Sequence, residues 1–251
     1  MTAILAIHAH PDDIELLAAG TLALLASAGH QITLATVTAG DCGSADSDRE
    51  EIARVRRLEA SKSAALIGAP YLCAELPDLA VFSDDPSRRR ITELIRQARP
   101  ELVLTASPAD YHPDHEATSL LVRDACFAAT ATNYHTGDAQ PLRAIPHLFF
   151  MDPVGGRDRE GRPIVPEFGV DVGATFETKC AMLEAHESQK AWMLKQHGIS
   201  DFLASMVAWS QRRGADYGVQ VAEGFRQYRT TPYPCSPLLQ ELVGEALRSV
   251  S

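Results

Sequence analysis

Two short clusters of histidine and carboxylate side chains stand out in this chain. The first runs from His10 to Glu15 (HPDDIE), and the second runs from Asp110 to Glu116 (DYHPDHE). Neutral imidazole nitrogens and carboxylate oxygens are ligands that suit zinc, and a catalytic zinc site has three protein ligands and one open position. If the fold brings the two clusters together, they can supply such a site.

Each cluster also has a simpler interpretation. An Asp-Asp pair ahead of a helix, such as Asp12-Asp13, can cap free backbone N–H groups and face the positive end of the helix dipole. A single loop histidine is usually a surface or hydrogen-bonded residue. Two clusters that each follow a strand-like run are harder to explain in this way. The residues alone leave the metal site and the capping interpretation both open.

The elements around these clusters follow from hydrophobic periodicity. Short apolar or β-branched runs predict strands, and longer segments with apolar residues at helical spacing predict helices. The segment 152–172 is rich in Gly, Pro and charge, and it is predicted to be a long surface loop. The predicted strands are 3–9, 31–38, 101–106 and 147–151, and the predicted helices are 15–28, 48–67, 87–99, 115–132, 175–189 and roughly 199–213.

This alternation of strands and helices predicts an α/β fold. We expect a Rossmann-like, mostly parallel sheet with helices on both faces, in a single domain over residues 1–251. The part beyond residue 150 is expected to pack on the sheet core. In such a sheet the ligand crevice lies at the carboxyl ends of the strands. Both clusters follow predicted strands, so both are expected at that edge.

Composition excludes several other classes of protein. The hydrophobic share of 45% and the charged share of 22% are those of an ordinary globular domain. A net charge of −10, with no clustered basic face, opposes nucleic-acid binding. Five widely spaced cysteines without a CxxC pair oppose a disulfide framework or a cysteine-based zinc site. No apolar stretch approaches the roughly 20 residues of a membrane helix. We therefore expect a cytoplasmic protein with neither a nucleic-acid nor a membrane partner.

Taken together, the two clusters resemble the paired signature of the LmbE-like, or PIG-L, deacetylase family, in which AHPDDxE is followed by HPDH. The first pattern begins at Ala9 and the second at His112. Arg56 and Glu59 match the family's Arg-x-x-Glu. The segments 186–189 (HESQ) and 222–225 (AEGF) are similar to its C-terminal segments. The resemblance covers residues 3–228.

The resemblance implies a zinc-dependent hydrolase that removes an N-acetyl group from a small N-acetylglucosamine-type conjugate. It assigns the zinc ligands to His10, Asp13 and His115. Zinc lowers the pKa of bound water towards about 7 and polarises an amide carbonyl, which suits this reaction. The family also implies a small-molecule amino-sugar substrate and self-association as a homo-oligomer.

The same resemblance gives roles to neighbouring residues. Asp12 matches the general base that takes a proton from the zinc-activated water, and His112 matches the general acid that protonates the leaving nitrogen. Asp114 matches the carboxylate that orients His112 and keeps it protonated. Arg56 is expected to bind sugar hydroxyls or an anionic aglycone group. Its simpler role is that of an i,i+3 partner of Glu59 on an exposed helix face.

Some positions depart from the family pattern or stay ambiguous. Some members place a tyrosine two residues before HPDH, where it helps the oxyanion. Asp110 occupies that position here, and Tyr111 is expected to point elsewhere. His8 lies inside the first strand and is expected to be a core residue or a partner of a ligand. Glu15 either supports the helix dipole or a ligand, or contacts substrate. His186 belongs either at the pocket rim or on a helix surface.

Two other functions remain open at this point. Two histidines and one carboxylate are also the ligands of non-haem iron(II) oxygenases. Those enzymes usually have all-β barrels, whereas this chain alternates strands and helices. A non-catalytic sugar-binding relic is the second alternative, although the set of ligands and acid–base residues is complete. Metal content and acetate release distinguish these functions from a zinc deacetylase.

Overall fold

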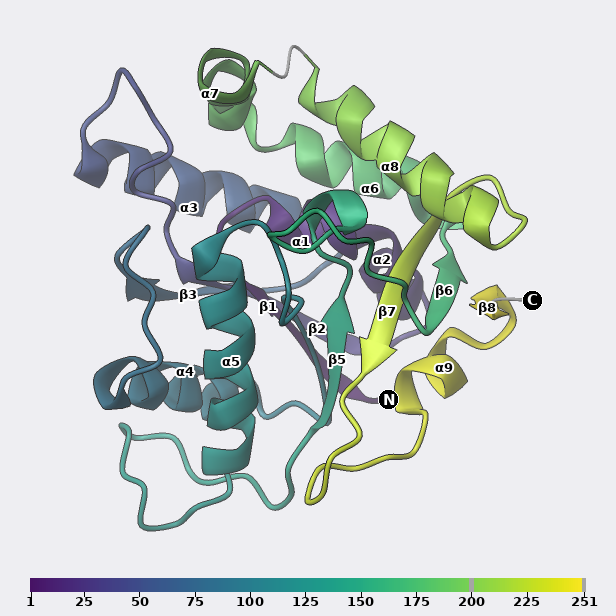
Figure 1. The fold of residues 1–251 in the computed structure, drawn as a ribbon. Helices are drawn as coiled ribbons and strands as arrows, with labels where there is room; N and C mark the ends of the chain where they lie inside the picture. Colours follow the sequence, from purple (N-terminus) through teal and green to yellow (C-terminus); the bar gives the residue numbers. More distant parts are fainter. Residues whose placement is uncertain (199–200, 250–251) are drawn as a thin grey trace.

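A computed structural model describes residues 1–198 and 201–249 of the chain. These residues form an eight-stranded sheet with the order β3-β2-β1-β4-β5-β7-β6-β8 (Figure 1). The first five strands in that order are parallel to one another, and β7, β6 and β8 continue the sheet in antiparallel pairs. The bounds are β1 (Ala3–His8), β2 (Gln31–Thr38), β3 (Tyr71–Leu76), β4 (Leu102–Thr105), β5 (His147–Met151), β6 (Phe168–Asp171), β7 (Ala222–Gln227) and β8 (Leu247–Ser249).

Helices cover both faces of this sheet (Figure 1). The α-helices are α1 (Asp13–Leu17), α2 (Ala19–Ser27), α3 (Arg49–Ala65), α4 (Asp85–Ala98), α5 (Pro113–Ala128), α6 (Phe176–Glu184), α7 (Glu187–His197), α8 (Phe202–Asp216) and α9 (Leu238–Val243). Short 3-10 turns are η1 (Val154–Gly156), η2 (Gly173–Thr175) and η3 (Gly244–Ala246). No helix of the described ranges is long and apolar enough to span a membrane.

Alternation along the strands divides the core into two layers. In β1, Ile4 and Ala6 face the layer that contains residues of α1, α2, α6 and α9. Leu5 and Ile7 face the opposite layer, which contains residues of α4 and α5. Successive strand residues point to opposite faces, so a strand buried on both faces must be apolar at every position. Helices α7 and α8 lie outside α6, on the first of these faces (Figure 1).

The predicted fold class is confirmed. The predicted strands 31–38 and 147–151 coincide with β2 and β5, and 3–9 and 101–106 differ from β1 and β4 only at their ends. Helices α3 and α4 begin where Asp48 and Asp84 accept backbone N–H bonds from the third residue beyond. Such caps stabilise a helix start. The organisation of residues 1–251 as one domain stays a prediction.

The predicted helix 15–28 is wrong in one respect, because two helices replace it. Helix α1 ends at Leu17, and Ala18 has a non-helical φ of −145°. Helix α2 then begins at Ala19, and its first free N–H groups, those of Gly20 and Thr21, donate to the Glu223 carboxylate at 2.9 and 2.8 Å. A distant residue therefore gives α2 a start that local sequence does not show.

The predictions for the C-terminal half need larger corrections. The expected surface loop 152–172 contains η1 and the short strand β6, in which Phe168 and Val170 are buried. The expected helix 175–189 is broken at Ala185 and His186 into α6 and α7. Strands β7 and β8 and helix α9 were not predicted, nor was β3. Residues 199 and 200, where the last predicted helix begins, lie outside the described residues.

Glu223 joins these C-terminal elements to the N-terminal half. Besides capping α2, its carboxylate accepts a bond from Lys179 Nζ at 2.6 Å, and both side chains are 1% exposed. Lys179 Nζ also donates to the Leu16 carbonyl at 2.8 Å. A charge buried to this degree is tolerated only when it is paired.

Replacing Glu223 by Ala should therefore destabilise the fold strongly. The change leaves the Lys179 ammonium buried without its counter-charge, which costs about 3–5 kcal/mol. Urea unfolding followed by circular dichroism measures this loss. The exposed Glu241 on α9 supplies the control, because Glu241→Ala removes no buried partner. Equal midpoints for the two variants would contradict the role given to Glu223.

Candidate active site

The two histidine–carboxylate clusters meet at the carboxyl edge of the sheet. One follows β1 and the other follows β4, and these strands are neighbours. Beyond β1 the chain enters α1 and α2 on one face, whereas beyond β4 it enters α5 on the other. This divergence is a topological switch point, where an open α/β sheet forms its ligand crevice. The clusters therefore face each other across the crevice, as expected.

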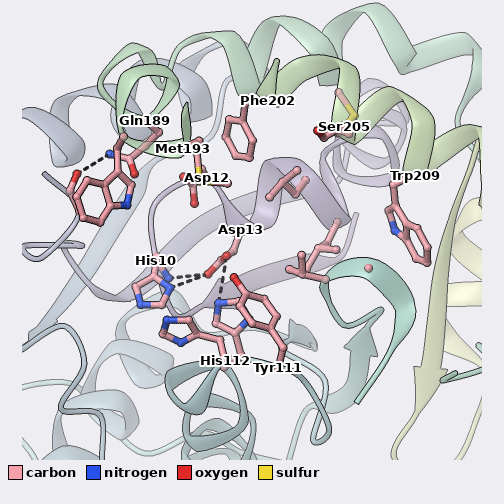
Figure 2. Close-up of a pocket in the computed structure, with 18 of the residues that line it drawn as sticks. His10, Asp12, Asp13, Tyr111, His112, Gln189, Met193, Phe202, Ser205 and Trp209 are labelled. Carbon is pink, nitrogen blue, oxygen red and sulfur yellow. Dashed lines mark hydrogen bonds and ion pairs between the residues drawn. The ribbon is translucent and has the colours of Figure 1, made fainter. Parts of the chain in front are cut away.

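The three predicted zinc ligands lie together in this crevice, and two of them, His10 and Asp13, are labelled in Figure 2. His10 Nδ1 lies 3.3 Å from one oxygen of Asp13, and His115 Nε2 lies 3.4 Å from the other. All three residues are buried. Two imidazoles and one carboxylate at this spacing form a donor set that fits zinc. The nitrogen atoms of His10, His112 and His115 also lie within 4.8 Å of one another.

Carboxylates behind the histidines contact their remaining nitrogen atoms. Asp110 Oδ1 lies 3.1 Å from His115 Nδ1, and Asp78 Oδ1 lies 3.1 Å from His10 Nε2. Burial lowers the pKa of His115, but the charges of Asp13 and Asp110 outweigh it and raise that pKa to about 9. Carboxylates in this position orient metal-binding imidazoles and raise their basicity.

Strand β1 holds the Asp13 carboxylate from the other side. His8 Nδ1 lies 2.7 Å from Asp13 Oδ2, and the backbone N–H of His10 donates to the same oxygen at 2.8 Å. His8 is fully buried, and this burial lowers its pKa despite the neighbouring carboxylate. Its position fits the expectation of a core residue that supports a ligand.

Asp12 occupies a strained turn beside the three ligands. Its φ is 107°, in a region that residues other than glycine rarely adopt. Arg56 Nη2 holds the turn by donating to the Pro11 carbonyl at 2.6 Å and to Asp12 Oδ2 at 3.3 Å. Burial raises the pKa of Asp12 to about 6, although the Arg56 charge opposes the shift. Strain of this kind is found where the surrounding structure fixes a functional geometry.

The structure corrects the simpler role considered for Arg56. The residue is 4% exposed, and its guanidinium binds the turn before α1 instead of Glu59. Glu59 is also buried and accepts bonds from the N–H and hydroxyl of Ser188. A sequence signal for this burial existed, because both residues share the helical stripe of Ile52 and Ala60. Contact of Arg56 with substrate stays a prediction.

The expected contact between the Asp114 carboxylate and His112 is replaced by a backbone bond. Asp114 Oδ2 accepts the Leu79 N–H at 2.7 Å and lies 3.4 Å from His10 Nε2. The Asp114 backbone N–H donates to His112 Nδ1 at 3.2 Å, because His112 is the N-cap of α5. Nδ1 is therefore an acceptor, and Nε2 carries the proton of the neutral ring. Burial and the charges of His10 and His115 lower the pKa of His112 to about 4, so Asp114 does not keep it protonated.

His186 is neither at the pocket rim nor on a helix surface. It is fully buried, and its Nε2 lies 3.0 Å from Glu15 Oε1. Ser63 Oγ donates to the same carboxylate oxygen at 2.5 Å. Glu15 therefore links α1 to α3 and to the start of α7, which is a supporting role.

A cavity of about 610 Å³ opens in front of these groups (Figure 2). Its inner end is polar and includes the predicted ligands together with Asp12, Arg56 and His112. Tyr111 also lines it, contrary to the expectation that its ring points elsewhere. The wall away from the ligands comes from α1, α7 and α8 and is apolar.

Comparisons with known proteins agree with this arrangement. Residues 5–126 match the family model PIG-L, described as GlcNAc-PI de-N-acetylase. Residues 5–126, just under half of the chain, are thus similar to the PIG-L family. Both histidine–carboxylate clusters lie inside the matched segment, whereas α6 to α9 lie beyond it.

Curated proteins similar to this chain include both deacetylases and a hydratase. A 4-oxalmesaconate hydratase of Pseudomonas putida is 24% identical over 74% of this chain and 73% of its own. A probable N-acetyl-alpha-D-glucosaminyl L-malate deacetylase 2 of Bacillus cereus is 25% identical over 83% and 94%. A 1D-myo-inositol 2-acetamido-2-deoxy-alpha-D-glucopyranoside deacetylase of Corynebacterium diphtheriae is 30% identical over 44% and 47%, so the match spans about half of that relative. The chain is accordingly an enzyme, and it is similar to deacetylases and to a hydratase.

Solved structures share the fold over nearly the whole chain. The conserved protein TT1542 from Thermus thermophilus superposes with a TM-score of 0.74 at 25% identity, covering 94% of this chain and all of that one. An N,N'-diacetylchitobiose deacetylase from Pyrococcus horikoshii has a TM-score of 0.75 at 22% identity, covering 94% and 88%. The predicted family and fold are thus confirmed.

Sequence reasoning missed two residues that the structure places at the site. Asp78 lies in the turn after β3 and contacts His10, but β3 itself was not predicted. Asp110 was noted only as a departure from the family tyrosine, whereas it is fully buried behind His115. Its spacing, five residues before a predicted ligand in a loop that follows a strand, was an available signal.

Asp110→Asn should weaken metal binding. The His112 N–H donates to Asp110 Oδ1 and the Val154 N–H donates to Oδ2, so the amide keeps an acceptor for one of them and removes the charge beside His115. Loss of such a partner typically lowers metal affinity by about 10–100-fold. Zinc titration in competition with a chromophoric chelator measures this effect. Asp138→Asn, at an exposed loop residue, is the matched control, and equal affinities for the two variants would remove Asp110 from this role.

Proposed function

We propose that this chain is a zinc-dependent N-deacetylase that hydrolyses the acetamide of a small N-acetylglucosamine-type conjugate. The observation that carries the proposal is the grouping of His10, Asp13 and His115 beside Asp12 and His112 at one end of the cavity. Zinc held by the first three residues would polarise the amide carbonyl and lower the pKa of a bound water. The PIG-L relatives that are named as deacetylases of GlcNAc conjugates support this choice.

Asp12 is assigned the role of general base. Asp12 lines the cavity, in the turn of positive φ described above. Arg56 holds that turn by its bond to the Pro11 carbonyl, so the base is positioned before substrate arrives. As water adds to the acetamide carbon, Asp12 takes one of its protons. Preorganisation of this kind lowers the entropic part of the barrier.

His112 is assigned the transfer of a proton to the leaving nitrogen. Its Nδ1 accepts the N–H of Asp114, so Nε2 is the atom available to the substrate. An amide nitrogen leaves poorly until it is protonated. When the C–N bond breaks, the nitrogen gains that proton, and acetate and a free amine result. Asp12 returns the proton that it took from the water to His112, so both side chains end in the protonation state in which they began.

Asp12→Asn should abolish turnover without removing the metal. Asparagine tolerates a positive φ, so the turn is preserved while the proton acceptor is lost. A fall in kcat of about 10²–10⁴-fold is expected for removal of a general base. Metal content by elemental analysis and acetate release are measured on the same preparation. A parallel loss of metal would withdraw the assignment of Asp12 as base.

Hydration of a double bond is the second candidate, because a hydratase is among the broadest sequence matches. The charge of the residues that line the cavity argues against a hydratase. The substrate name of a structural neighbour, 4-carboxy-2-hydroxymuconate, describes a molecule with several carboxylates. Two arginines line the cavity in the described part of this chain, and the inner one, Arg56, is already bound to Pro11 and Asp12. A polyanion would have few cations to pair with.

An assay panel decides among these functions. N-acetylglucosamine and several of its conjugates are incubated with protein before and after chelation, and after zinc is restored. Equimolar acetate and free amine, lost on chelation and regained with zinc, are expected. Hydration of an unsaturated dicarboxylate without acetate release would replace the proposal by the hydratase. Oxygen consumption with iron and 2-oxoglutarate would favour an oxygenase, and binding without any turnover would favour the sugar-binding relic.

A further inference from the structure

The cavity changes character with distance from the histidine–carboxylate end. Its outer wall is built largely from α7 and α8, with α1 beneath (Figure 2). Met193, Phe202 and Trp209 border the open space in that view. The apolar side chains that matter here are Leu16, Leu17, Met193, Phe202, Met206 and Trp209. Such a wall binds ligands chiefly by removing apolar surface from water.

Two polar side chains of this outer part, those of Ser205 and Gln189, are already engaged, and Arg212 is the charged residue that α8 adds to the lining. Ser205 Oγ donates to the Asp201 carbonyl at 3.0 Å. Gln189 Nε2 donates to the Gly43 carbonyl at 3.3 Å and to Ser188 Oγ at 3.0 Å. A polyhydroxyl group placed against the apolar side chains here would lose its bonds to water and recover few from the protein. Burying polar groups without new partners is unfavourable.

The space also continues beyond the first cavity. A second hollow of about 390 Å³ shares Gly155, Trp209 and Arg212 with it. Ile164 and Val165 are among the apolar residues that line this hollow. Trp209 therefore stands where the two volumes join, and a group that passes the sugar position has room to extend along its ring.

We propose that the conjugate carries an apolar aglycone, an aryl or alkyl group that lies against α7 and α8 and reaches Trp209. The inference rests on the proposed function for the sugar end, because the histidine–carboxylate groups receive the acetamide. The new inference adds that the outer wall of the cavity selects the aglycone by apolar contact. Polar aglycones such as polyols are disfavoured by the same wall.

Binding can be measured without turnover. The chain has two tryptophans, Trp192 and Trp209, and both line this cavity. Chelated protein is titrated with methyl, glyceryl and phenyl glycosides of N-acetylglucosamine while tryptophan fluorescence is recorded. The phenyl glycoside should bind about tenfold or more tightly than the methyl glycoside, as expected for burial of an aromatic ring. The glyceryl glycoside, of similar size but polar, should show no such gain. Equal affinities for all three would overturn the inference.

A pair of adjacent substitutions locates the effect on the proposed wall. Met193→Asp places a charge in the cavity lining, whereas Leu194→Asp makes the same change at a neighbouring side chain that is 54% exposed and outside the lining. Met193→Asp should remove the preference for the phenyl glycoside and leave methyl-glycoside affinity unchanged. Leu194→Asp should preserve the preference. Loss of the preference in both variants, or in neither, would contradict this placement.

Trp209→Phe gives a second test that keeps an aromatic ring beside Arg213, which stacks on the tryptophan at 4.6 Å. The smaller ring should reduce phenyl-glycoside affinity and leave that of the methyl glycoside unchanged, and an unchanged phenyl affinity would exclude contact with Trp209.

Turnover is assayed separately on the zinc-loaded parent protein. Apolar preference without acetate release would refute the deacetylase assignment and leave the aglycone inference standing. Acetate release without apolar preference would overturn the aglycone inference and leave the deacetylase assignment standing.

Discussion

The buried carboxylate of Asp13 is the constraint on which the site depends. It has lost nearly all contact with water, and imidazoles from two distant segments take the place of that hydration. His8 lies 2.7 Å away in β1, His10 follows in the next turn, and His115 reaches the other oxygen from α5. A charge buried in this way is strongly unfavourable unless such partners are present. The pairing therefore requires β1 and β4 to be neighbours with their following helices on opposite faces.

A second set of buried polar contacts fixes the C-terminal helices over that site. Glu223 and Lys179 join β7 and α6 to the start of α2. Glu15 meets His186 at the start of α7, and Glu59 on α3 receives two bonds from Ser188. The apolar wall of the cavity is therefore placed by charged and polar anchors behind it, one on each of α1, α2 and α3. Without them α7 would have little to define its distance from the ligands.

Much of this arrangement could be predicted from sequence because local patterns encode it. Continuous apolar runs identify buried parallel strands, and a polar cluster after such a strand must lie at the sheet edge. The rest depends on partners that are distant in the chain. Glu223 lies in a strand whose sequence, AEGFRQ, has no strand-like alternation, and its role appears only when Lys179 and α2 are beside it. The Asp114 carboxylate was misplaced because the HPDH residues do not show that α5 begins at Pro113 with His112 as its N-cap.

The polar inner end and the apolar outer wall of the cavity come from different parts of the chain: the segment that matches PIG-L and the helices that follow it. The PIG-L match ends at residue 126 and contains the histidines and carboxylates that could perform hydrolysis. Met193, Phe202, Met206 and Trp209 come from helices beyond that match. Relatives named for hydration and for deacetylation can therefore share the inner end, since water addition to a carbonyl and to a polarised double bond need similar groups. In this chain the helices laid over the inner end present mostly hydrocarbon and aromatic side chains to the cavity, together with Arg212.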